Sequence, residues 1–363
     1  MVLNTTALSR VLPAPAFIQL PSVGVDISDT SLKYIQFKPI YRGRGGNTLH
    51  AWGDIDIPEG VLQRGQVNDV KALSAVLADV YKKTGVEFVR ISLPEERAYI
   101  FETVINRGTT LLEIRSQIEF RLEEHVPLSP RDAFFDYEII DENEKHLTVA
   151  VVVYARETIM SYYEAAQSAG VTPLAFEVEA QAIARATLPG GGEGTHMIVD
   201  FGKTRTGVGI VHNGNLLYTS TIDIGGSVLS SSLRKHLGDK PESELTQLKN
   251  TKGLVPHKET PAVCEILLMS MGGIKDEIAT RLQYWHTRDH DRNKRRIESI
   301  VLCGGSANLK GVTEYLTETL GIPAVRGDVW RNTVLPHDFV PPISVRYSYG
   351  YATAIGLALK QAA

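Results

Sequence analysis

Two short stretches of the chain place an aspartate at the end of an apolar run and follow it with a turn of small and hydroxyl residues. They are VDISDTSLKYIQF, residues 25–37, and VDFGKTRTGVGIV, residues 199–211. In both, an alternating strand pattern resumes after the turn. Backbone N–H groups in a tight turn bind anions, and a neighbouring aspartate can hold Mg²⁺ together with phosphate oxygens. The two stretches therefore predict facing hairpins, with Asp26 and Asp200, that clamp the phosphates of a nucleotide.

The turn residues have the sizes and donors that such an anion site requires. Small residues let the backbone approach a ligand closely, and hydroxyl groups add hydrogen-bond donors. The candidates for binding the nucleotide are Ser28, Asp29, Thr30 and Ser31 in the first turn and Gly202, Lys203 and Thr204 in the second. Aspartate and threonine are also ordinary turn formers, and that interpretation is the better one for a single copy. Because two matched copies occur about one domain length apart, we favour the interpretation that these turns bind an anion.

The tripeptide Gly202-Lys203-Thr204 also matches the end of a P-loop, but the rest of that motif is missing. A P-loop carries an earlier glycine at a fixed spacing, and Met197 occupies that position here. The dipeptide Asn213-Gly214 then predicts a two-residue hairpin turn. This stretch is therefore predicted to form strand, turn and strand, not a phosphate loop followed by a helix.

Glycine turns come just before two predicted helices in the second half of the chain. They are Gly225-Gly226 and Gly304-Gly305-Ser306. Glycine permits close approach of the backbone to a ligand, and the N-terminus of a helix favours negative charge. These turns are candidates for contacts with the sugar and the base of a nucleotide.

Residues 179–187 and 349–360 predict two helices that pack closely. Alanine recurs at alternate positions in both, and small side chains let two helix axes cross at a short distance. A crossing of this kind suits a hinge between domains. High helix propensity alone would explain the alanines, but Gly356 argues against that interpretation. Elsewhere, Gly272-Gly273 predicts a kink or a break in a helix.

The composition of the whole chain limits its class. It has 363 residues, 43% of them hydrophobic, and a formal net charge of −4, so we expect two domains and no nucleic-acid partner. The two cysteines indicate neither a disulfide framework nor a cysteine metal site. No apolar run reaches the ~18 residues of a membrane span. We interpret residues 1–22 as an N-terminal arm and expect membrane association only through partners.

In their order along the chain, five of these elements resemble the superfamily of actin, sugar kinases and heat-shock chaperone ATPases. The phosphate-1, connect-1, phosphate-2, adenosine and connect-2 motifs of that superfamily look like residues 24–37, 177–187, 198–210, 300–311 and 350–359. The resemblance implies a two-domain α/β protein of the actin-like ATPase (ribonuclease H-like) fold, with ATP and Mg²⁺ as ligands.

The resemblance also implies roles for individual side chains. Asp26 and Asp200 would hold the Mg²⁺ and its waters, and Lys33 would reach a phosphate. Glu179 would be the catalytic residue that orients the attacking water, with Glu177 as its close rival.

Residues 106–176 are similar to the inserted subdomain, IC, of the FtsA and PilM families. The segment begins with a capping box, Thr110 and Glu113. The sequences EEHVPLSP, FDYE and PLAFEVEAQAIAR resemble the PilM family of type IV pilus assembly proteins, as does VGVDISDTSLKYIQF. The resemblance covers nearly the whole chain from about residue 22.

This resemblance implies a division of the chain into subdomains. Subdomain IA comprises residues 23–105, 177–194 and 343–363, IC comprises 106–176, IIA comprises 195–238 and 297–342, and IIB comprises 239–296.

The family implies a cytoplasmic scaffold that is peripheral at the inner face of the cytoplasmic membrane. It would bind the N-terminal cytoplasmic tail of a PilN-like bitopic membrane protein, in a groove involving subdomains IA and IC, and link it to the pilus assembly motor ATPase. The sequence departs from the superfamily at Ser28, which replaces the usual glycine, at Asp29, which adds a negative charge near the phosphates, and at Lys203 and Arg205. These departures imply at most slow ATP hydrolysis. The alternatives are an FtsA-like cell-division scaffold and a small-molecule kinase, whose ATP turnover an acceptor would stimulate.

Overall fold

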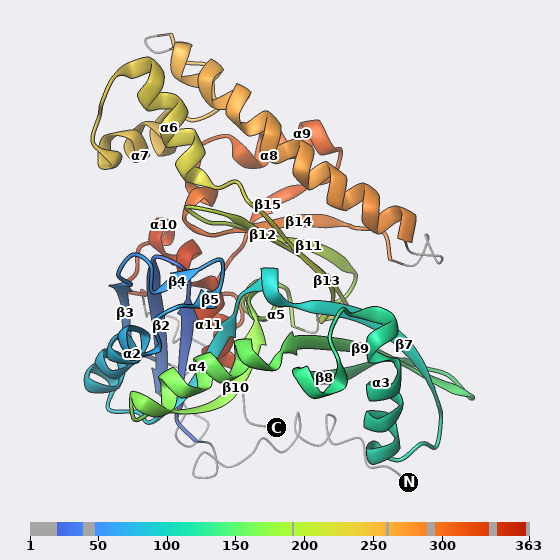
Figure 1. Cartoon of the computed structure of the whole chain (residues 1–363). Coiled ribbons are helices and arrows are strands. Elements are labelled where there is room, and N and C mark those ends of the chain that lie inside the picture. Colours follow the sequence, from blue (N-terminus) through green and yellow to red (C-terminus); the bar gives the residue numbers. More distant parts are fainter. Residues whose placement is uncertain are drawn as a thin grey trace.

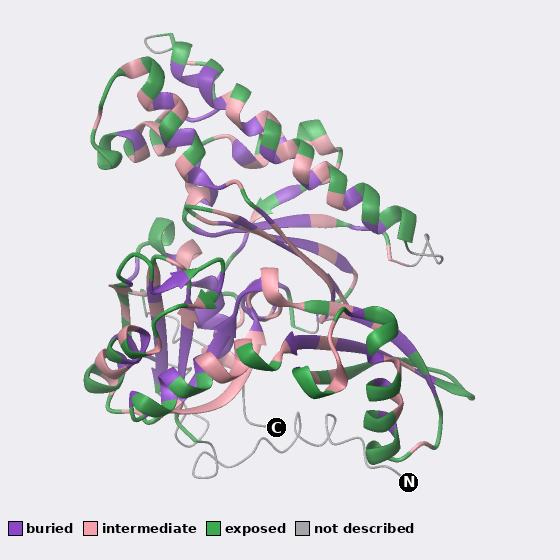
Figure 2. Cartoon of the chain, in the orientation of Figure 1, coloured by how far each residue is buried: buried purple, intermediate pink, exposed green. Residues whose placement is uncertain are grey.

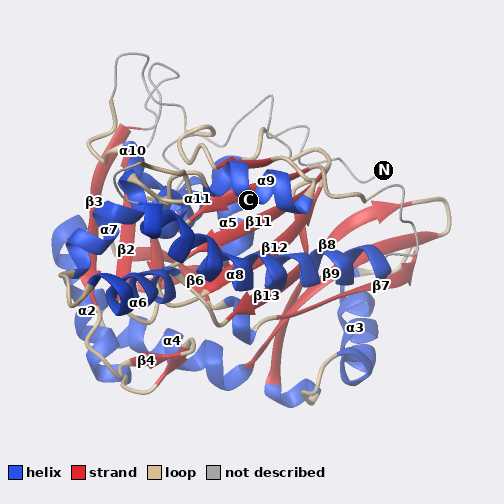
Figure 3. Ribbon diagram, turned by 90° about the horizontal axis from the view of Figure 1, so that it is seen from above, coloured by secondary structure: helices blue, strands red, loops and turns tan. Residues whose placement is uncertain are grey.

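The computed structural model describes residues 20–38, 48–190, 192–258, 261–288, 295–333 and 340–360. Most of the predicted N-terminal arm, up to residue 19, lies outside these ranges. The chain forms two halves, each built on a five-stranded sheet, and a smaller third sheet projects to one side (Figures 1 and 3). None of the helices in the described ranges combines the length and the hydrophobicity that a membrane-spanning segment needs.

The first sheet carries the first Asp turn. Its strands are β1 (Val23–Ile27), β2 (Ser31–Lys38), β3 (Thr48–Asp56), β6 (Phe88–Leu93) and β10 (Thr172–Val178), in the order β10-β6-β1-β2-β3. β1, β2 and β3 are antiparallel, whereas β6 runs parallel to both β1 and β10. The carboxyl ends of β1, β6 and β10 therefore meet at one edge of the sheet, beside the β1–β2 turn.

Helices cover both faces of the first sheet. α2 (Val70–Thr84) and α4 (Arg156–Ser168) pack together on one face, and α5 (Glu179–Thr187) and α11 (Ala352–Leu359) lie on the other (Figure 3). The boundaries of α2 follow from capping, since Asp69 accepts a hydrogen bond from the Ala72 amide at 3.0 Å. Gly85 then ends the helix with a φ of 65°.

The second sheet repeats the topology of the first. Its strands are β11 (Thr195–Phe201), β12 (Thr206–His212), β13 (Asn215–Ile222), β14 (Ser299–Cys303) and β15 (Ala324–Arg326), in the order β13-β12-β11-β14-β15. β11, β12 and β13 are antiparallel, and β14 is parallel to β11 and to β15. The predicted similarity of the two Asp-turn hairpins is thereby confirmed. Asn213 and Gly214 form the expected turn, with φ values of 49° and 81°.

The outer part of the second half is helical. Its helices are α6 (Gly226–Leu237), α7 (Glu242–Thr251), α8 (Pro261–Arg288) and α9 (Val312–Leu320). Of the predicted kink or break at Gly272-Gly273, the break is wrong, because α8 continues through these glycines as one helix of 28 residues. Met271 and Ile274 flank the glycines and are buried against the core of this half. Packing thus outweighs the weak helix propensity of glycine.

The third sheet has its own small core. It consists of β7 (Tyr99–Asn106), β9 (His146–Ala155) and β8 (Ala133–Glu142), in the order β7-β9-β8, and α3 (Leu111–His125) packs on one face. The predicted capping box is present at the start of α3, where Thr110 and Glu113 bond each other reciprocally. α4 and the first part of β10, which also lie within residues 106–176, pack with the first sheet instead.

Short elements connect these layers. They are β4 (Leu62–Gln63), β5 (Gln66–Val67), α10 (Val345–Ser348) and the 3₁₀ helices η1 (Glu95–Arg97), η2 (Pro130–Asp132), η3 (Gly305–Asn308) and η4 (Tyr349–Tyr351).

The two alanine-rich helices cross at a short distance, as predicted. A Cβ placed on Gly356 of α11 would lie 1.8 Å from the carbonyl oxygen of Ala182 in α5. Both helices are almost entirely buried where they cross, between the two large sheets (Figure 2). The crossing fixes α5, and with it the position of Glu179, against both halves of the chain.

Candidate functional site

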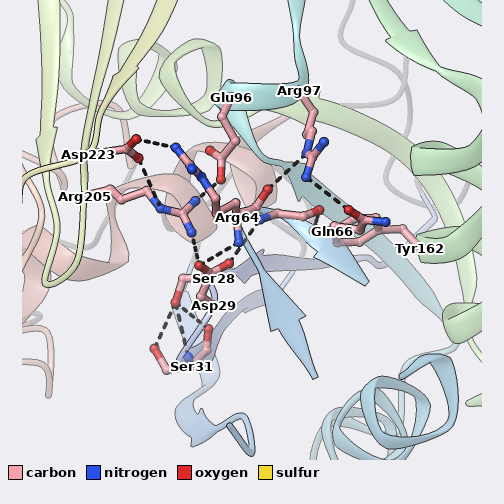
Figure 4. A network of polar contacts seen from close by, with 11 residues as sticks. Ser28, Asp29, Ser31, Arg64, Gln66, Glu96, Arg97, Tyr162, Arg205 and Asp223 are labelled. Carbon is pink, nitrogen blue, oxygen red and sulfur yellow. Dashed lines mark hydrogen bonds and ion pairs between the residues drawn. The ribbon is translucent and has the colours of Figure 1, made fainter. Parts of the chain in front are cut away.

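The two Asp turns face each other across the junction of the two halves. The first turn closes through a hydrogen bond from the Ser28 amide to the Ser31 carbonyl at 2.9 Å. The second closes from the Gly202 amide to the Arg205 carbonyl at 3.0 Å. Arg205 then forms an ion pair with Asp29 of the first turn (Figure 4). The structure therefore brings together two stretches that are far apart in the sequence.

Both turns present amide groups that could bind an anion. Among the residues that the structure describes, no hydrogen bond engages the amides of Asp29 and Thr30 in the first turn or of Lys203 and Thr204 in the second. Successive free N–H groups in a turn form an anion-binding concavity. Four amides from two facing turns suit a ligand with several phosphates.

Beneath the turns lie three acidic side chains that the sequence singled out. Burial raises the pKa of Asp26, although the Lys33 ammonium and a 3.0 Å hydrogen bond from Ser92 Oγ partly offset this increase. Burial, and then the charge of Asp26, raises the pKa of Asp200 to about 7. The same two causes hold the pKa of Glu179 well above its usual value. This concentration of negative charge favours a cation.

Lys33 supplies a positive charge beside this acidic group. Its Nζ donates to Ser31 Oγ at 2.8 Å and lies 3.7 Å from the Asp54 carboxylate. In the described part of the chain, no three His, Cys, Asp or Glu side chains are close enough together to hold a metal ion. A Mg²⁺ between Asp26 and Asp200 would therefore depend on waters and phosphate oxygens for its other ligands, as is usual for this ion.

Glu95 is a further acidic residue of this site, and we did not predict it from the sequence. It lies on η1, is 2% exposed, and neither of its carboxylate oxygens has a hydrogen-bond partner among the described residues. Burial, and then the charge of Asp200, raises its pKa to about 8. The Ala180 amide and the Thr219 hydroxyl act to lower the pKa, but neither makes a hydrogen bond of normal geometry with Glu95. The sequence did contain a signal for this position, since Glu95 follows a buried strand, β6, whose carboxyl end lies beside that of β1.

Glu95→Gln is expected to raise the free energy of unfolding at pH 8 by about 2 kcal/mol. Glu95 keeps its proton up to about pH 8 in the folded chain, against an ordinary pKa of 4.5. The folded state therefore binds more protons between these values, and the stability of the wild type falls as pH rises. Glutamine removes this dependence. Urea unfolding at pH 5 and pH 8 would measure it, with Glu123→Gln on the exposed side of α3 as the control. An unchanged pH dependence in Glu95→Gln would contradict the assignment.

The predicted glycine turns gather around the second Asp turn. Ser306 Oγ and the Gly226 amide both donate to the Gly202 carbonyl, at 2.9 and 3.0 Å. A Cβ on Gly304 would lie 2.4 Å from Asp200 Oδ1, so only glycine fits there. The Gly226 amide is thus already hydrogen-bonded within the protein and is not free for a ligand. Gly305 differs, because a Cβ placed there would meet no atom within 4 Å. Gly305 has the open surroundings that a ligand requires.

Glu177 and Glu179 lie in different places although only one residue separates them. Glu179 begins α5 and turns toward Asp26, as described above. Glu177 forms ion pairs with Arg185 and Lys360, and these three line a groove on another side of the molecule. Geometry therefore favours Glu179 over Glu177 for a role at the phosphate turns.

The groove has a volume of about 630 Å³ and lies between two sheets. One wall is the face of the third sheet that α3 leaves uncovered. It presents Phe134, Asp136, Glu138, Ala150, Val152 and Tyr154, which the strand register places on one face. The other wall contains Phe176 and Val178 of β10. Among the described strands, β8 and β10 are both edge strands, so each has one unpaired edge beside the groove.

The fold and the sequence both match known proteins. A solved structure of a PilM-PilN type IV pilus biogenesis complex is 18% identical, covers 94% of this chain and 98% of its own, and has a TM-score of 0.75. Ethanolamine utilization protein EutJ from Carboxydothermus hydrogenoformans is 16% identical, with coverage of 98% and 99% and a TM-score of 0.51. MreB 5 of Spiroplasma citri, bound to AMPPNP, is 13% identical, with coverage of 93% and 94% and a TM-score of 0.52. These similarities confirm the predicted two-domain, actin-like fold.

The family follows from the sequence match. The model of the family described as type IV pilus assembly protein PilM matches residues 24–362. Because this match spans nearly the whole chain, the protein belongs to the PilM family of type IV pilus assembly proteins.

Proposed function

We propose that the chain is a nucleotide-binding scaffold of type IV pilus assembly that holds the N-terminal cytoplasmic tail of a PilN-like bitopic membrane protein. The observation that carries this proposal is the groove between β8 and β10. The tail would bring the chain to the inner face of the cytoplasmic membrane, and the chain would contact the pilus assembly motor ATPase from there. The groove lies where the predicted subdomains IA and IC meet.

The groove suits a short extended peptide. An edge strand has unpaired N–H and C=O groups, which an added strand can bond, while pockets beside it select side chains. Phe134, Tyr154 and Phe176 provide apolar surface in the groove. Asp136 and Glu138 stand on the same wall. The groove therefore favours a peptide with alternating apolar and polar or basic side chains.

The same proposal assigns ATP and Mg²⁺ to the two facing Asp turns. The free amides of both turns would bind the phosphates, and Lys33 would add a charge. Asp26 and Asp200 would hold the Mg²⁺ through its waters, and the ion would supply charge neutralisation at the phosphates. Glu179 would orient a water molecule beside the terminal phosphate. Gly304, Gly305 and Ser306 would border the sugar and the base.

Slow hydrolysis at most is expected from this arrangement. Ser28 stands where the superfamily usually has glycine, Asp29 adds a negative charge to the first turn, and Glu95 adds a buried carboxyl group near Asp200. The water that attacks the terminal phosphate has to be positioned by a side chain that is itself held in one orientation. Glu179 interacts with four other carboxyl groups, those of Asp26, Glu95, Asp200 and Glu96, so the water is not its only partner.

Val152→Trp is expected to reduce the affinity for the tail peptide at least about tenfold, because an indole at this position fills the groove. Val152 lies on β9, on the face that lines the groove. The measurement is fluorescence anisotropy with a labelled peptide that has the sequence of the N-terminal tail of the PilN-like protein.

Leu112→Trp is the matched control, since Leu112 is 79% exposed on α3, the helix that packs against the same three-stranded sheet. It adds an indole of the same size outside the groove and should leave the affinity unchanged. Equal affinities for the wild type and Val152→Trp, in a folded protein, would show that the tail binds elsewhere.

A further inference from the structure

One arginine connects the two Asp turns. Arg205 is the last residue of the second turn, and its guanidinium forms ion pairs with Asp29 and Glu96, both from the first half of the chain (Figure 4). Its Nε also lies 4.0 Å from Asp223 of its own half. The side chain is only 19% exposed. Arg205 thus lies among three carboxylates at the junction of the two halves.

Asp29 does not depend on Arg205 for its position. Its carboxylate also accepts hydrogen bonds from the amides of Arg64 and Gly65, at 3.0 and 3.1 Å. These amides belong to the tight turn between β4 and β5, where Arg64 has the unusual φ of 51°. The side chain of Arg64 pairs with Asp223 (Figure 4). Asp29 and Asp223 therefore keep other partners when Arg205 leaves them, and the long side chain of Arg205 is the group that can change partners.

The position of Arg205 also favours a phosphate. It follows directly after Lys203 and Thr204, whose amides are free of hydrogen bonds within the described residues. A guanidinium presents several N–H donors in a planar fork that matches phosphate oxygens as well as it matches a carboxylate. An anion at the free amides would thus lie within reach of the Arg205 side chain.

We propose that Arg205 is a ligand of the terminal phosphate of a bound nucleoside triphosphate, and that Asp29 and Glu96 compete with this phosphate for it. The proposal rests on the nucleotide site proposed above. A triphosphate draws the guanidinium away from Glu96 and Asp29, whereas a diphosphate, which ends one phosphate earlier, leaves these ion pairs in place. Arg205 thereby makes the contact between the two halves depend on the terminal phosphate.

The test is calorimetric titration of the full chain with Mg-AMPPNP and with Mg-ADP. Arg205→Gln is expected to lose about tenfold or more in affinity for Mg-AMPPNP. The substitution removes a charge-assisted contact with the terminal phosphate and leaves the carboxylates of Asp29 and Glu96 without their cation. Its affinity for Mg-ADP should fall less than about threefold. Glu96→Gln is expected to bind Mg-AMPPNP several times more tightly, since Arg205 then has one competitor fewer.

Arg234→Gln is the matched control. Arg234 also pairs with two carboxylates, Asp239 and Glu242, but both belong to its own half of the chain. Its loss should leave both affinities unchanged.

Opposite effects of Arg205→Gln and Glu96→Gln would support the proposal, because a merely structural ion pair would be broken in the same way by either change. Equal losses of Mg-AMPPNP affinity in both variants would overturn it. Equal losses for Mg-AMPPNP and Mg-ADP in Arg205→Gln would overturn it as well. If the wild type bound neither nucleotide, the proposed nucleotide site itself would be wrong.

Discussion

Asp200→Ala is expected to lower the affinity for Mg-ATP about a hundredfold, because one of the two carboxylates that would hold the Mg²⁺ and its waters is lost. Asp200 is the last residue but one of β11 and lies under the second turn, where Gly304 leaves space for its carboxylate. Burial and Asp26 raise its pKa to about 7, so the protein provides little to stabilise its charge without a cation. Nucleotide titration at pH 8 would measure the loss.

The same titration in EDTA separates the metal from the phosphate contacts. Without Mg²⁺, Asp200→Ala should bind ATP at least as well as the wild type, since the variant has one carboxylate fewer to repel the phosphates. An equal loss of affinity with and without Mg²⁺ would argue against a role for Asp200 at the metal.

Lys203→Ala provides the comparison that distinguishes this site from a P-loop. Lys203 is exposed at the tip of the second turn, and its loss should weaken Mg-ATP binding less than the loss of Asp200. A larger effect of Lys203→Ala than of Asp200→Ala would indicate that the lysine is used as it is in a P-loop.

Gly356→Ala is expected to lower the free energy of unfolding by about 3 kcal/mol or more. The added methyl group would lie 1.8 Å from the carbonyl oxygen of Ala182, so the backbone of α5 or α11 has to move. These helices lie between the two large sheets and cannot separate without loss of core contacts. Urea unfolding of the full chain, followed by circular dichroism, would measure the change.

Gly272→Ala is the control for this substitution. Gly272 lies within α8, and a Cβ there would meet no atom within 4 Å. Because alanine is the better helix former, we expect a gain of about 0.5 to 1 kcal/mol. A Gly356→Ala variant as stable as the wild type would show that the crossing of α5 and α11 can relax.

Much of the fold could be predicted from the sequence because its signals are local. The two Asp turns are each followed by an alternating strand, and Asn213-Gly214 marks the next hairpin. The capping box that begins α3 is also a local feature. The order of these elements was enough to indicate the actin-like fold. The error at Gly272-Gly273 arose because local propensity says nothing about the packing that holds α8 together.

The sequence by itself determined which side chains could bind phosphates and metal, because their types and spacing repeat in two hairpins. Tertiary structure alone decided that Glu179 and not Glu177 turns toward Asp26, and that Glu95 joins them beneath the turns. It also decided that Arg205 bridges the turns and that two sheet edges form a groove. The physical reason is that such contacts depend on how twisted sheets and crossing helices pack against one another. The local sequence around each residue does not show which distant residues this packing brings into contact with it.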